Sequence, residues 1–121
     1  MRATVLILLA ACAHHAPAPV YAELETRTAR IVEAMDRLVV SLEAADDCHQ
    51  MAYALRQFSR YATELGELDH LRLQLTREER ELFDYNHEDD ADRPRRVLAA
   101  SRRCMADRET HVAYEAAGFW H

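Results

Sequence analysis

The sequence DDCHQMAYALRQF, residues 46–58, marks the point where one predicted helix ends and the next begins. Aspartate is a favoured N-cap residue, and its negative charge suits the positive end of a helix. From there, apolar residues recur every three or four positions, which is the period of a helix with one buried face. They are Cys48, Met51, Leu55, Phe58, Ala62 and Leu65. We therefore predict a helix that begins after Asp46-Asp47 and ends at Gly66, because glycine commonly follows the last helical residue.

The residues before this point form a second stripe of the same kind. It predicts a helix from about Tyr21 to Ala45, with apolar residues at alternating steps of four and three, interrupted once by threonine. The stripe consists of Leu24, Thr28, Ile31, Met35, Leu38, Leu42 and Ala45. Because the connection between the two helices is so short, they should form an antiparallel hairpin.

The chain after Gly66 gives weaker signals. Leu71, Leu73 and Leu75 alternate with polar residues, which favours an extended connection. Thr76 and Glu79 have the spacing of a capping box, which predicts a short third helix ending near His87. We expect an acidic loop over residues 88–92.

A fourth helix should carry Pro94 in its first turn and run to about Ala117, with Gly118 as its stop. On a helical wheel its inner face holds Val97, Leu98, Ser101, Cys104, Met105, Arg108, Val112 and Glu115. Phe119 and Trp120 should fold back onto the other helices.

The predicted fold is thus all-α, a small up-down-up-down helical bundle formed by residues 21–121. Half of the residues are apolar, and the chain has only two glycines and three prolines, which disfavours sheets joined by tight turns. The formal net charge is -6, with acidic residues spread along the helices. Nucleic-acid binding requires a basic stripe, so we expect no nucleic-acid partner.

The N-terminus has the organisation of a secretory signal. Arg2 precedes an apolar run over residues 3–11, whose helical length of about 14 Å is too short to cross a bilayer. Its end, Leu9-Ala10-Ala11-Cys12, resembles the lipobox of bacterial prolipoproteins.

This resemblance implies cleavage before Cys12, a diacylglycerol on its thiol and an acyl chain on its new amine. Residues 1–11 would then be the signal peptide, and residues 12–20 a tether made semi-rigid by Pro17 and Pro19. The acyl chains would insert into the lipid bilayer. Ala13 is not the aspartate that signals inner-membrane retention in such lipoproteins, which favours the outer membrane, facing the periplasm. The alternative is an ordinary cleaved signal and a soluble periplasmic or secreted protein.

Cys48 and Cys104 remain as an even pair in an oxidising compartment, which predicts a disulfide. The alternative is two buried free thiols. Cys104 lies ten residues beyond Pro94, while Cys48 opens its helix. If both helices began level, the cysteines would differ in height by about 15 Å, so the bond requires the fourth helix to start about two turns higher.

No catalytic motif is recognisable, so we expect a non-enzymatic protein without a cofactor, acting in envelope support or by contact with an unidentified protein. The alternative is a metal- or haem-binding bundle. The helix layout resembles the periplasmic four-helix cytochrome that holds non-covalent haem b, which implies Met35 and His111 as axial ligands. His111 and Glu115, four residues apart, could also supply two metal ligands.

Overall fold

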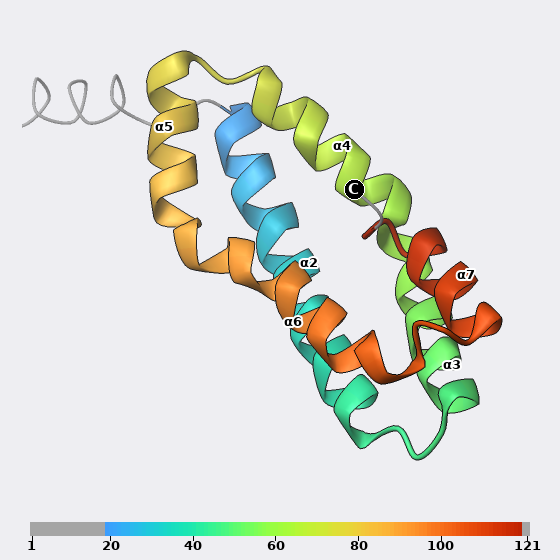
Figure 1. The fold of residues 1–121 in the computed structure, drawn as a ribbon. Helices are drawn as coiled ribbons and strands as arrows, with labels where there is room; N and C mark the ends of the chain where they lie inside the picture. The colour runs from blue at the N-terminus through green and yellow to red at the C-terminus, as the bar shows by residue number, and fades with distance from the viewer. Residues whose placement is uncertain (1–18, 120–121) are drawn as a thin grey trace, which may run out of the picture.

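The computed structural model describes residues 19–119, and these form helices without strands, so the all-α prediction is confirmed (Figure 1). The α-helices are α2 (Pro19–Ala44), α3 (Cys48–Phe58), α4 (Ala62–Leu73), α5 (Arg77–Asn86), α6 (Arg93–Ser101) and α7 (Arg108–Ala116). Short 3-10 segments join some of them: η1 (Ser59–Tyr61), η2 (Glu88–Asp92) and η3 (Arg102–Cys104).

The predicted hairpin is confirmed. Asp47 caps α3 by accepting a hydrogen bond from the backbone N–H of Gln50, and α2 and α3 pack against each other. The stripe residues Ile31, Met35, Leu38 and Leu42 of α2 are buried, as are those of α3 from Met51 to Phe58. The two apolar stripes therefore form the centre of the core.

The predicted end at Gly66 is wrong, and so is the extended connection that was expected after it. The chain passes from α3 through η1 into α4 and stays helical to Leu73. Leu68 and Leu75 are buried, Leu71 packs on the core, and Leu73 is 58% exposed. This pattern has helical spacing, and burying one helix face outweighs the cost of about 1 kcal/mol for an interior glycine.

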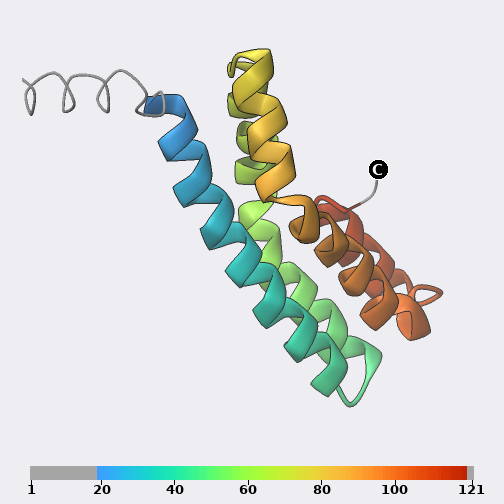
Figure 2. The same ribbon diagram turned by 90° about the vertical axis from the view of Figure 1, so that its left-hand side faces the viewer.

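The third leg of the bundle, which consists of α5, η2 and α6, is longer than the predicted third helix. The capping box of Thr76 and Glu79 opens α5 as expected, but η2 then leads directly into α6, so the expected acidic loop is a helical turn. This leg runs parallel to α2: Asn86 donates to the hydroxyl of Tyr21, and Arg93 pairs with Asp36 further along. Figure 2 shows α5 and α6 on the same side of the α2–α3 hairpin.

The prediction of one continuous fourth helix is wrong. Pro94 does lie in the first turn of α6, but the chain breaks over residues 102–107, and Asp107 caps a new helix, α7. The break changes the helical phase, so Arg108, Val112 and Glu115 are exposed instead of facing inward. The buried residues of α7 and of the turn after it are Thr110, Ala113, Tyr114 and Ala117.

The C-terminal stop is confirmed. Gly118 ends α7 with a φ of 92°, a backbone conformation that suits glycine. Phe119 then folds back as predicted, and its ring stacks on Phe58 with 5.2 Å between centroids. Trp120 lies outside the described residues, as do the predicted signal peptide and all of the tether before Pro19. Within residues 19–119 no helix is long and apolar enough to cross a membrane.

Candidate functional site

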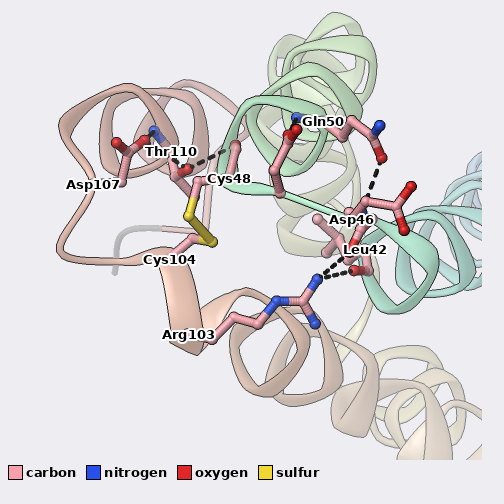
Figure 3. Close-up of a disulfide and its surroundings, with 10 residues drawn as sticks. Leu42, Asp46, Cys48, Gln50, Arg103, Cys104, Asp107 and Thr110 are labelled. Carbon is pink, nitrogen blue, oxygen red and sulfur yellow. Dashed lines mark hydrogen bonds between the residues drawn. A yellow bond between two sulfur atoms is a disulfide. The ribbon is translucent and has the colours of Figure 1, made fainter.

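The disulfide between Cys48 and Cys104 joins the start of α3 to the end of η3 (Figure 3). The two Cα atoms are 5.5 Å apart, within the usual range for a disulfide. The expected mismatch in height is absent because α6 runs parallel to α2, and therefore antiparallel to α3. α6 and η3 thus end beside the end of α2 and the start of α3, where Cys104 meets Cys48.

Hydrogen bonds fix the chain on both sides of this disulfide. Thr110 of α7 is fully buried, and its hydroxyl donates to the carbonyl oxygen of Cys48 at 3.2 Å. The guanidinium of Arg103 donates to the carbonyl oxygens of Leu42 and Ala45 at the end of α2. The disulfide and these hydrogen bonds therefore connect α2, α3, η3 and α7. Figure 3 shows Thr110 on one side of the two sulfur atoms and the contact between Arg103 and Leu42 on the other.

An open groove of about 640 Å³ lies along the α2–α3 hairpin. Its lining comes only from residues 34–61, so α5, α6 and α7 contribute nothing to it. Buried Ala34, Leu38 and Phe58 form its floor, and the half-exposed Tyr53 stands at its side. Its volume is within the range of about 300–1,000 Å³ that is typical of small-molecule sites. We therefore take this α2–α3 groove as the candidate functional site.

The ionisable groups that line the α2–α3 groove, apart from two tyrosines, are Arg37, His49 and Arg60. Arg37 pairs with Glu33 one turn back, at 3.1 Å and well exposed. The guanidinium of Arg60 lies 4.9 Å from the ring centroid of Tyr61 and donates to its hydroxyl. The groove is thus apolar along its floor and cationic at its margins.

His49 connects the groove to α7. Its Nδ1 lies 3.1 Å from the carboxylate of Glu109, to which Arg56 donates at 2.8 Å. The hydrogen bond from Arg56, followed by that from His49, lowers the pKa of Glu109. Glu109 is therefore a stable anion that holds α3 to α7, and it is poorly suited to accept a proton.

A second cluster of charges surrounds His87, at the junction of α5 and η2. Its Nε2 is 2.9 Å from Glu25 on α2, and its Nδ1 is 2.6 Å from Asp90, which also accepts from Arg93. Burial of the ring opposes its positive charge, but the hydrogen bonds to Asp90 and Glu25 outweigh burial and raise the pKa of His87. Both ring nitrogens are engaged, so this cluster ties helices together rather than presenting a free base.

The residues predicted for haem or metal binding are not brought together. Met35 is buried in the core on α2, whereas His111 lies on the exposed face of α7, 2.9 Å from the carboxylate of Glu115. Neither His111 nor Met35 lines the α2–α3 groove. Within residues 19–119, no three His, Cys, Asp or Glu side chains are placed to hold a metal ion. Cys12, the predicted lipidation site, lies outside the described residues.

The sequence patterns identified the cysteine pair but missed the α2–α3 groove and the His87 cluster. Asp107, with Thr110 three residues later, was an available sign of a new helix start. The groove residues carry no such sign, because alanines, glutamines and tyrosines on two helices have no motif spacing.

Comparison with known proteins adds no assignment: no protein-family model matches the chain, and neither a curated protein nor a solved structure is significantly similar to it.

Proposed function

We propose that this chain is a lipid-anchored bacterial envelope protein whose helical domain acts by binding and contact rather than by catalysis. The observation that carries the proposal is Leu9-Ala10-Ala11-Cys12, which ends an apolar run of signal-peptide length. Acylated Cys12 would insert into the bilayer, with the outer membrane as the favoured location. Several acyl chains on one residue give stable attachment, since each buried methylene contributes about 0.8 kcal/mol.

Two features of the helical domain support this proposal. The disulfide of Cys48 and Cys104 suits an exported protein, because disulfides persist in oxidising compartments. Only the short segment 13–18 would separate Cys12 from the start of α2. At no more than about 3.6 Å per residue, the seven steps from Cys12 to Pro19 would keep the start of α2 within roughly 25 Å of the acylated residue. The domain would therefore work close to the membrane surface.

The test is metabolic labelling and fractionation of the full chain in a bacterial host. Wild-type protein should incorporate labelled palmitate, sediment with membranes and have a mature mass that begins at Cys12 and includes the lipid. Cys12→Ser should lose the label and the membrane attachment.

The matched control is the double variant Cys48→Ser/Cys104→Ser, which removes the other two cysteines and should keep the label. A wild-type protein that stays soluble, carries no lipid mass and begins after Ala13 would contradict the proposal.

A further inference from the structure

The α2–α3 groove has an uneven distribution of charge. The hairpin turn at residues 45–47 lies at one end, close to His49, whereas Arg37 and Arg60 lie in the half away from the turn. In the described part of the chain, residues 19–119, no aspartate or glutamate lines the groove, although the chain contains 21 acidic residues and has a net charge of -6. An acidic protein with a groove lined by two arginines and no carboxylate has local charge complementarity for an anion.

Arg60 is the cation best placed to receive that anion. Among residues 19–119 no carboxylate lies within ion-pair distance of its guanidinium, which instead rests over Tyr61. Arg37 makes an exposed ion pair with Glu33, a kind of interaction that is weak in water and easily exchanged. Arginine binds carboxylates and phosphates through two parallel hydrogen bonds, so a ligand with either group would suit Arg37 and Arg60.

The rest of the groove requires an apolar group. Ala34, Leu38 and Phe58 form its floor, and the small Ala45 and Ala54 leave space beside it. Tyr53 is 58% exposed at its side, and tyrosine can cover an apolar ligand while its hydroxyl stays in water. A ligand would therefore lie along the hairpin, with its apolar part on the floor and its charge beside the arginines.

The size of the groove favours a small molecule over a partner protein. A stable protein interface uses about 20–30 residues on each side, whereas 14 residues line this groove. Its volume of about 640 Å³ lies within the usual range for small ligands.

We propose that the α2–α3 groove binds a single-chain anionic amphiphile, with the acyl chain on the floor and the carboxylate or phosphate head between Arg37 and Arg60. A fatty acid and a single-chain phospholipid both have this chemistry. The site differs from the lipid anchor proposed at Cys12 and does not depend on its acylation.

The experiment uses the full chain carrying Cys12→Ser, so that no attached acyl chain competes. Laurate, dodecyl phosphate and dodecyltrimethylammonium, all below their micelle concentrations, are titrated separately while amide NMR shifts are followed. The two anions should shift the amides of Ala45, Tyr53 and Ala54 in a saturable way, and should bind at least about tenfold more tightly than the cation with the same chain. Tighter binding of dodecyl phosphate would favour a phospholipid, and tighter binding of laurate a fatty acid.

Variants separate the two parts of the site. Arg60→Gln should weaken binding of the anions by about tenfold, and it should not weaken binding of the cation, because it removes a repelling charge. Arg95→Gln removes an exposed arginine of α6 outside the groove and should change neither. Ala44→Trp fills the groove from its exposed rim and should abolish binding of all three probes, while thermal unfolding confirms that the variant is folded.

Equal affinity for the anions and the cation, or shifts confined to other helices, would overturn the proposal. So would a concentration-dependent dimer of the free protein that Ala44→Trp converts to a monomer, because a second copy would then occupy the groove. The proposal would also be rejected if an acidic amphipathic helical peptide bound in the groove while neither laurate nor dodecyl phosphate did.

Discussion

The disulfide end of the molecule, residues 38–58 and 93–119, differs from the α4–α5 end, residues 19–34 and 62–90, in what holds it together. At the disulfide end, α2, α3, α6 and α7 meet around side chains that are almost wholly inaccessible: Leu42, Met51, Leu55, Val97, Ser101 and Thr110. At the α4–α5 end, α2 still buries Tyr21, Leu24 and Ile31. However, α4 and α5 each bury one residue, Leu68 and Phe83, and Leu75 is buried in the turn between them.

Ion pairs add to a thinner layer of packing at the α4–α5 end. Arg27 pairs with Glu64 and Glu67 between α2 and α4, Arg72 pairs with Asp84 between α4 and α5, and His87 joins α5 to α2. Exposed ion pairs contribute little each, typically less than about 1 kcal/mol. One chain can therefore have a tightly packed core at one end and a contact that relies more on exposed ion pairs at the other.

Loss of the disulfide should have the largest effect. The bond closes a loop of 56 residues, for which chain entropy gives about 4 kcal/mol as an upper value. The double variant Cys48→Ala/Cys104→Ala should lower the free energy of unfolding by most of that amount, measured by urea denaturation with wild type under oxidising and reducing conditions. Reduction of the wild type should produce a similar loss. If both losses are below about 1 kcal/mol, the disulfide end does not depend on its covalent link.

Truncation of a leucine at each end should have unequal effects. Leu55→Ala leaves a cavity in the disulfide end and should cost about 3 kcal/mol. Leu82→Ala removes the same atoms from a side chain of α5 that is 53% exposed and should cost less than about 0.5 kcal/mol. Chemical denaturation of the two variants measures the difference. Equal costs would contradict the exposed position of Leu82 on α5.

The charge-held end should respond to pH through His87. A histidine whose folded pKa is raised stabilises the folded state fully below its unfolded pKa of about 6.5, and that stabilisation is lost as pH rises through the folded pKa. His87→Gln should therefore cost about 1–2 kcal/mol at pH 5.5 and clearly less at pH 8.5.

The control for this measurement is His111→Gln, which changes an exposed histidine that also pairs with a glutamate. It should change the free energy of unfolding by less than about 0.5 kcal/mol at either pH. A His87→Gln cost that does not change with pH would mean that His87 supports the fold by packing on Phe83 alone.

Local signals in the sequence were sufficient where neighbouring residues decide the structure. The cap at Asp47 and the capping box at Thr76 each use side chains and backbone groups within three residues, and both helices begin as predicted. The local signals gave the wrong structure at Leu71, Leu73 and Leu75, because the pattern of this stretch fits both a strand and a helix. There, packing of Leu68 and Leu75 on the core selected the helix.

Helix period, capping and residue type are local properties, so the chain itself encodes the helical class, the α2–α3 hairpin and the two cysteines available to bridge. The break of the last predicted helix over residues 102–107 has one local sign, the N-cap at Asp107, but the contacts that hold the break in place are tertiary. There, Cys104 must reach Cys48 across 56 residues, and Thr110 must reach the carbonyl oxygen of Cys48. Tertiary packing also forms the α2–α3 groove and the contact between His87 and Glu25, since each brings together side chains from separate helices. Such positions depend on how distant segments pack, and no short-range pattern in the chain encodes that packing.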